Sequence, residues 1–498
     1  MSDRDHNHDF IHHPLRAMLV VAAPTVITMT SYTVMQFIDG LMVSRIGPDR
    51  IYISAQGNGG MVVWLAMSMA LGLMTVVNTY VSQNLGAGRP QRGAAYGWTA
   101  LWLSAFGGVA MLALAPALPK LFGALDHPPE LVAMETGYAR ILIYGAFFTM
   151  AARGIAHYFY GMHMPAIVMI AALVGNLVNV ASNALLIFGA DGPPPGTPLA
   201  GAFGAVATAL DLPAMGVEGA ALGTVIGSAV ELCFPLAVFL SPRMHARFGT
   251  RTPWRPAMGP IRDILRLGWP GALMFVNEMI CWGALMVWLI PMAGEAAGED
   301  PVLHNTAGWI ALRYMHVSFM PAVGLSIAVT AIVGRCMGMA RVDLAFRRAM
   351  LGLAVALGYM GACALAFILF REPMIRAFTP EDLAPEALER LIEIGSSIMI
   401  AAAVFQVFDA IAIIMTGALR GAGDTVWPGM VTVALSWTCI VGGGRLIIEI
   451  APQLGSLGPW IGGASYIILL GVALLGRFAG GRWRTMGVVE TPVGVRPA

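Results

Sequence analysis

Residues 72–89 read GLMTVVNTYVSQNLGAGR, and residues 324–341 read GLSIAVTAIVGRCMGMAR. The two stretches share glycine, leucine, two valines, glycine and arginine at matching steps, 252 residues apart. A shorter pair, FYG at 159–161 and LRG at 419–421, repeats with a displacement of 260 residues. The chain is therefore predicted to consist of two similar halves in which small insertions have accumulated.

Composition indicates that most of the surface faces lipid. Hydrophobic residues make up 57% of the 498 residues and charged residues only 11%, whereas soluble domains are about one quarter charged. The net charge of +1 argues against a nucleic-acid partner, which requires a basic surface. A membrane-spanning helix needs about 20 mainly apolar residues. Twelve such runs lie near residues 16–43, 55–84, 94–117, 131–160, 164–189, 216–241, 262–292, 307–336, 346–370, 388–417, 427–450 and 458–479.

These runs predict an all-α integral membrane protein with twelve transmembrane helices in two six-helix lobes. Six helices per half is an even number, so both halves enter the membrane from the same side and are related by a pseudo-twofold axis along the membrane normal. We expect an N-lobe at 16–241, a basic cytoplasmic linker at 242–261 and a C-lobe at 262–480. Cytoplasmic tails are expected at 1–15 and 481–498.

Basic residues predict the orientation. The linker contains four arginines, whereas the connections at 190–215 and 293–306 contain no lysine or arginine. Because positive charge collects on the cytoplasmic side, both termini are predicted to be cytoplasmic, in a bacterial-type inner membrane. We expect the protein to function as a monomer.

Three acids lie inside the apolar runs: Asp39, Glu278 and Asp409. An ionisable residue at the centre of a membrane helix costs about 2.5–3.5 kcal/mol on insertion scales, so it usually faces a cavity and has a function. Asp39 follows a polar stripe that includes Tyr32 and Gln36, which suits the interior of a lobe. The alternative is an acid at the membrane interface held by a neighbour.

Glu278 and Asp409 both belong to the second half and could form one oxygen-rich site. A buried carboxylate without a partner takes up a proton or finds a cation, and either event is coupling-ion chemistry. Gln406 lies on the same helix face as Asp409. The structural alternative for Glu278 is an ion pair with Arg313.

Further polar residues are candidates for the lobe interior. Asn176, Asn179 and Asn183 share one helix face, where they either line a substrate path or bond neighbouring helices. His316 shares a face with Arg313 on the eighth run. Arg313, His316 and Glu231 could serve as counter-charges that hold one state closed, whereas Arg153 could simply lie close to the cytoplasmic interface. The sequence leaves the roles of Glu231 and Arg153 open.

Motifs for other chemistry are absent from the sequence. It contains no Walker A loop, no HExxH and no GxSxG elbow, so we expect neither an enzyme nor a cofactor. Transport would then be driven by an ion gradient, which supplies about 2.3 kcal/mol per charge per 100 mV.

The chain resembles the multidrug and toxic compound extrusion (MATE) family, particularly its NorM branch, over roughly residues 15–480. The motifs that carry the resemblance are Pro24 followed by FIDGLMVSRIG (37–47), NLVNVASNALLIFG (176–189), GVEGAALGT (216–224), Pro270 with Glu278, FMPAVGLSIAVTAIVGR (319–335) and FDAIAIIMTGALRGAGDT (408–425).

The resemblance implies an antiporter that exports small organic compounds, often amphipathic cations, in exchange for Na⁺ or H⁺. It implies that Glu278 and Asp409 bind the coupling cation, Na⁺ included, and that Asp39 is the carboxylate of the first lobe. Asn179 matches a family amide, whereas Asn183 stands where many relatives have aspartate. That difference favours cation binding in the second lobe over a proton relay through Asp39.

Two other functions fit a chain of this class. A lipid-linked saccharide flippase of the same superfamily would need arginines inside its cavity, but the central positions here are mainly acids and amides. A membrane-embedded biosynthetic enzyme would need a convergent catalytic set, such as aspartate-rich metal motifs, and the sequence shows none.

Overall fold

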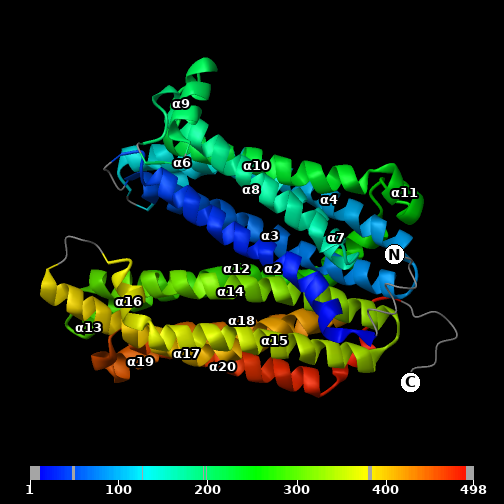
Figure 1. Ribbon diagram of the computed structural model, residues 1–498. Helices are drawn as coiled ribbons and strands as arrows, with labels where there is room; N and C mark the ends of the chain where they lie inside the picture. The colour runs from blue at the N-terminus through cyan, green and yellow to red at the C-terminus, as the bar shows by residue number, and fades with distance from the viewer. Residues whose placement is uncertain are drawn as a thin grey trace. The chain divides into compact units, whose positions relative to one another are not determined.

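The computed structural model describes residues 12–47, 51–125, 127–194, 196–197, 199–379 and 384–489. Residues 1–11 and 490–498, which make up most of the two predicted tails, lie outside the described residues. Within the described part the chain is helical and contains no strand (Figure 1). Eleven helices there are long and apolar enough to cross a membrane, or up to twelve if one bent pair counts as a single span. The predicted all-helical membrane fold is confirmed.

The helices of the first half are α2 (Pro14–Val43), α3 (Ile51–Gly86), α4 (Pro90–Leu112), α5 (Leu118–Gly123), α6 (Pro129–Tyr144), α7 (Ala146–Gly161), α8 (Pro165–Phe188), α9 (Ala200–Ala209), α10 (Gly216–Phe239) and α11 (Pro242–Phe248). Those of the second half are α12 (Met258–Ala284), α13 (Ile290–Ala296), α14 (Pro301–Gly338), α15 (Val342–Leu369), α16 (Arg371–Arg376), α17 (Pro385–Ala422), α18 (Val426–Leu435), α19 (Gly444–Ile450) and α20 (Leu457–Ala479). Many of them begin at proline, which lacks the backbone N–H that the first helical turn leaves without an acceptor.

Several predicted runs are interrupted in the structure. The run at 131–160 is the pair α6 and α7, bent by 48° at Gly145. The runs at 262–292 and 427–450 contain π-helical turns at Leu285–Leu289 and Ser436–Gly443. The connection at 190–215 contains a further helix, α9, which projects beyond α8 and α10 in Figure 1.

The chain forms two compact units. Unit 1 comprises the described residues of 1–26, 86–88 and 269–498, and unit 2 those of 27–85 and 89–268. Helix α2 therefore begins in unit 1 and ends in unit 2, whereas α12 begins in unit 2 and ends in unit 1. The linker expected at 242–261 includes α11 and belongs to unit 2.

Unit 1 is built around α14 and α17, with α15 and α20 alongside (Figure 1). Two hydroxyls of α14 bond to α17: Ser326 Oγ donates to the carbonyl of Ile413 (2.8 Å), and Thr330 Oγ1 donates to that of Gly417 (2.9 Å). Hydrogen bonds between helices and close backbone approach replace the hydrophobic effect as the source of stability inside lipid.

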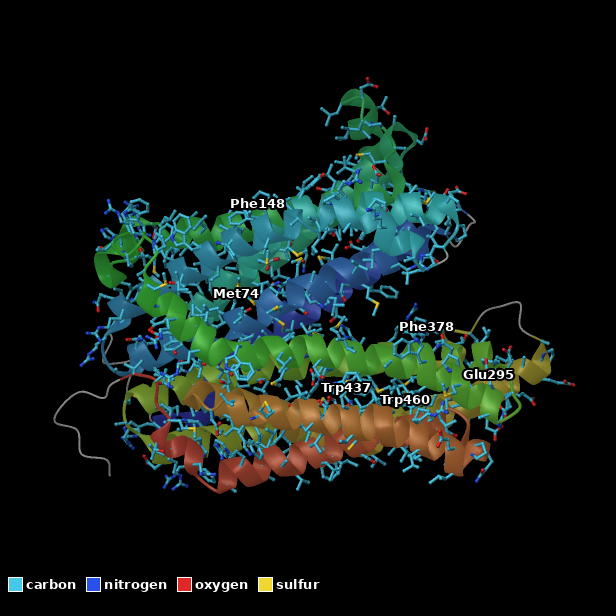
Figure 2. All side chains as sticks on the ribbon, turned by 180° about the vertical axis from the view of Figure 1, so that it is seen from behind. Met74, Phe148, Glu295, Phe378, Trp437 and Trp460 are labelled. Atoms are coloured by element: carbon cyan, nitrogen blue, oxygen red, sulfur yellow. The ribbon has the colours of Figure 1, made fainter. Side chains whose placement is uncertain are left out.

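The same close contact occurs in both units at positions related by the sequence repeat. A β-carbon on Gly161 would lie 2.8 Å from the carbonyl oxygen of Asn78 in unit 2. Met74, which is labelled in Figure 2, precedes Asn78 by four residues in α3. A β-carbon on Gly421 would lie 2.5 Å from the carbonyl oxygen of Thr330 in unit 1. Asn78 and Thr330 are separated by the 252-residue displacement found in the sequence. The sequence repeat therefore corresponds to a repeated helix contact in the structure.

Candidate ion-binding and polar sites of the two units

Three helices of unit 1 bring together Glu278 of α12, Asp409 of α17 and Tyr466 of α20. The Tyr466 hydroxyl donates a hydrogen bond to Glu278 Oε1 (2.8 Å). The charges of Glu278 and Asp409 are close enough to interact. Among the described residues, neither carboxylate forms an ion pair and Asp409 has no hydrogen-bond partner. The Arg420 guanidinium of α17 nevertheless lies close enough for its charge to act on Glu278. We call Glu278, Asp409 and Tyr466 the unit 1 acid site.

A neighbouring network holds the turn of α12 that carries Glu278. The Asn277 amide donates to Ser436 Oγ (2.7 Å) and accepts from the indole of Trp437 (2.8 Å), which is labelled in Figure 2. Both partners lie in the π-helical turn at Ser436–Gly443. Since Asn277 precedes Glu278 directly, this network fixes the backbone from which the carboxylate extends.

The remaining unit 1 candidates make contacts of different kinds. Gln406, one turn before Asp409, is buried and donates to Ser318 Oγ of α14 (2.6 Å). His316 also lies on α14, and its Nε2 has no hydrogen-bond partner among the described residues. Arg313 is exposed and lies over the ring of Phe378, 5.7 Å from its centroid. The alternative in which Arg313 pairs with Glu278 is therefore not seen.

Unit 2 places Asp39 against the asparagine face of α8. Asn183 donates to Asp39 Oδ1 (2.8 Å), and its amide also lies 3.5 Å from Asn179 Oδ1. Asn179 in turn donates to Thr224 Oγ1 of α10 (3.3 Å). Asp39, Asn179 and Asn183 are all buried. The carboxylate of unit 2 is thus held by neutral amides and by no ion pair within the described part of the chain.

A second polar cluster of unit 2 contains both charges whose role the sequence left open. The Tyr32 hydroxyl donates to Glu231 Oε1, which also lies 3.8 Å from Arg153 Nη1. The Arg153 guanidinium lies over the Tyr32 ring, 3.6 Å from the centroid. We call Tyr32, Arg153 and Glu231 the unit 2 charge cluster; its acid and base compensate each other.

The two polar groups of unit 2 are linked along α2 and α8. Asn176 lies one turn before Asn179 and donates to Ser31 Oγ (3.0 Å), next to Tyr32. Gln36, on the same helix, is exposed and forms none of these contacts. All three predicted asparagines therefore bond other polar side chains inside unit 2.

Sequence reasoning missed Tyr466 and Thr224, the hydroxyl partners in the two units. Tyr466 lies in the apolar stretch GGASYIILL, where no polar stripe marks it. Within the described residues, no group of three or more His, Cys, Asp or Glu side chains could hold a metal ion. Two carboxylates and a phenol oxygen in unit 1 suit a monovalent cation or a proton better than a transition metal.

Comparison with known proteins shows the family of the chain. The MatE family model matches residues 24–185 and 280–442, which is most of the chain and one segment in each half. The chain belongs to the MatE family. It is a MATE transporter and not an enzyme, and transport in this family is coupled to ions.

Relatives of this MATE chain extend over nearly its whole length. It is 27% identical to the "Probable multidrug resistance protein NorM" of Thermotoga maritima, over 88% of this chain and 86% of the relative. It is 28% identical to the protein of the same name from Deinococcus radiodurans, over 93% and 95%. It is 26% identical to the "Multidrug resistance protein MdtK" of Pectobacterium atrosepticum, over 90% and 91%.

Solved structures confirm the MATE fold. A "Crystal structure of MATE in complex with MaL6" superposes with a TM-score of 0.80 at 22% identity, over 95% of this chain and 97% of that one. An "Outward-facing conformation of a multidrug resistance MATE family transporter of the MOP superfamily" gives a TM-score of 0.78 at 21% identity, with the same coverage.

Proposed function

We propose that this chain is a secondary active antiporter that exports small organic compounds, mainly amphipathic cations, in exchange for Na⁺ or H⁺ by alternating access. The observation that carries the proposal is the unit 1 acid site, in which the charges of two carboxylates inside membrane helices act on each other. Neither forms an ion pair among the described residues, although the charge of Arg420 acts on Glu278. Similarity to proteins named for multidrug resistance supports the substrate class.

The coupling ion binds at Glu278 and Asp409. Two like charges inside a bundle repel each other and lose hydration, so a cation or proton that neutralises one of them stabilises the site. The Tyr466 hydroxyl already donates to Glu278, which orients the carboxylate before the ion arrives. Carboxylate and hydroxyl oxygens are hard ligands that suit Na⁺ as well as H⁺.

The proposed role of Asp39 in unit 2 differs from that of the unit 1 acid site. Its carboxylate is buried and accepts an amide hydrogen bond, so it remains available to a cationic group without competition from a basic side chain. We propose that Asp39 and the asparagines of α8 contact the substrate or a second coupling ion. The unit 2 charge cluster is compensated internally and serves as a structural counter-charge pair.

Coupling requires that ion and substrate bind the two conformational states with different affinity. An inward ion gradient supplies about 2.3 kcal/mol per charge per 100 mV, which drives export. We propose that the protein works as a monomer in a bacterial-type inner membrane, with both termini and the arginine-rich connection between α10 and α12 in the cytoplasm.

The experiment that tests the proposal is ethidium transport in everted membrane vesicles, with Na⁺ and pH gradients imposed separately. Glu278→Gln and Asp409→Asn should each abolish gradient-driven transport while protein levels stay normal. Glu386→Gln is the matched control, because Glu386 is exposed in the first turn of α17. The proposal is wrong if both acid-site variants transport at the wild-type rate under either gradient.

A further inference from the structure

The segment that joins α10 to α12 presents a basic surface on unit 2. Its arginines are all exposed: Arg243, Arg247, Arg251, Arg255, Arg262 and Arg266. The one acid between residues 240 and 268 is Asp263, whose carboxylate accepts a hydrogen bond from the Tyr96 hydroxyl (2.7 Å). We call these six arginines, with Trp254 and Met258, the linker surface.

Specific hydrogen bonds fix the backbone of the linker surface to the helices of unit 2. The indole of Trp98 donates to the carbonyl of Thr250 (2.6 Å), and the indole of Trp102 donates to that of Trp254 (2.9 Å). The Ser241 hydroxyl accepts from the first turn of α11 (3.3 Å), and Phe248 at the end of that helix is buried. The arginines are therefore presented in a preformed arrangement, which lowers the entropic cost of binding a ligand.

Apolar side chains lie next to these charges. Trp254 is 50% exposed and Met258 is 77% exposed, and the Arg255 guanidinium lies 5.4 Å from the Trp254 ring centroid. Tryptophan beside arginine at the end of a spanning helix is typical of the membrane–water interface. A free phosphate ion would use the charges but not the apolar side chains.

Three of the six arginines are available to an anion. Among the described residues, no carboxylate pairs with Arg243, Arg255 or Arg262. Arg251 uses its Nε to cap the carbonyl of Leu240 at the end of α10 (2.7 Å). The connection at 190–215 contains two acids and no base, so it offers no comparable positive charge.

We propose that the linker surface is a binding site for the headgroup of an anionic phospholipid, with the arginines on the phosphate and Trp254 and Met258 against the upper acyl chain. Clusters of four to eight basic residues beside a membrane helix bind anionic lipid in this way. This assignment depends on the proposed membrane location of the chain but not on its proposed transport activity.

Thermal unfolding of the purified full-length protein in detergent tests this assignment. Added phosphatidylglycerol should raise the unfolding temperature, whereas phosphatidylcholine should not. In the variant R243Q/R255Q/R262Q the lipid should bind about a hundredfold more weakly, so the shift disappears. The control R140Q/R347Q/R376Q removes three exposed arginines elsewhere and should keep the shift.

Native mass spectrometry gives a second readout that does not depend on stability. Wild type and control should retain phosphatidylglycerol after purification, and the linker variant should lose it. Equal shifts with both lipids, an equal shift with inorganic phosphate alone, or retained lipid in the linker variant would overturn the assignment. Ethidium transport measured in parallel keeps this outcome separate from the fate of the proposed antiport.

Discussion

The unit 2 charge cluster allows a quantitative prediction. Glu231→Gln removes the negative charge but keeps an oxygen that can accept from the Tyr32 hydroxyl, so it isolates the interaction with Arg153. At 3.8 Å and an effective dielectric constant of about 20, Coulomb's law gives about 4 kcal/mol. Breaking a buried pair costs about 3–5 kcal/mol in measured cases. The Arg153 side chain is 25% exposed, so we expect the lower end, about 3 kcal/mol.

The assay is a double-mutant cycle on the free energy of unfolding in detergent. Glu231→Gln and Arg153→Gln should each destabilise the protein by about 3 kcal/mol, because each leaves one charge without its partner. The double variant should lose much less than the sum, with a coupling energy of about 2–3 kcal/mol. Tyr32→Phe should cost about 2 kcal/mol, the loss of one hydrogen bond to a charged group.

Additive single effects would refute this reasoning, since the two charges would then not depend on each other. A cost below about 0.5 kcal/mol for Glu231→Gln would do the same, as only solvated surface charges behave in this way. In either case the cluster would have to be reassigned to the ion or substrate path.

Three further predictions concern other parts of the molecule. Gly421→Ala should destabilise unit 1 by about 1–3 kcal/mol, because its β-carbon would lie 2.5 Å from a carbonyl oxygen of α14. Gly476→Ala, which has no atom within 4 Å of the new β-carbon, should stabilise α20 by up to about 1 kcal/mol. The unfolding temperature should therefore fall in the first variant and rise in the second. Asn183→Ala removes an amide donor from the unit 2 carboxylate and should shift the ion concentration for half-maximal efflux by about tenfold, and an unchanged value would contradict a role for that carboxylate in coupling. Hydrogen bonds from Arg390 hold the pKa of Glu299 below its usual value, so this pair stabilises the fold at neutral pH and loses that contribution as the pH falls below about 4.5. Arg390→Gln should therefore be less stable than wild type at pH 7, by a difference that shrinks as the pH falls below about 4.5. A difference that stays constant as the solution is acidified would show that the pair is not responsible.

Much of the fold could be predicted from the sequence because lipid imposes a simple rule on length and polarity. The apolar runs correspond to the spanning helices, and the repeat at 72–89 and 324–341 marks equivalent helices in the two halves. The bend at Gly145 and the two π-helical turns could not be predicted, because apolar residues on both sides of each irregularity look alike. The apolar run at 199–210 is compatible with a short helix such as α9, but the prolines on both sides of it favour a loop.

The sequence predicts the two acids of the unit 1 acid site but not the side chain that bonds to them. Glu278 and Asp409 stand out because charge is costly in lipid, whereas Tyr466 is 188 residues from Glu278 and belongs to an unremarkable apolar stretch. The sequence marks Glu231 and Arg153 as isolated charges and does not predict that they pair. Their pairing through Tyr32 depends on how three helices pack, which single-sequence periodicity does not contain.

The matching glycine contacts of the two units bear on the origin of the chain. FYG and LRG share only their glycine. In both halves this glycine packs closely against a backbone carbonyl of the neighbouring helix. This shared contact is most simply explained if the gene segment that was duplicated already encoded a bundle with that packing. The duplicated segment would then have encoded a half-length helical bundle that already contained this glycine contact.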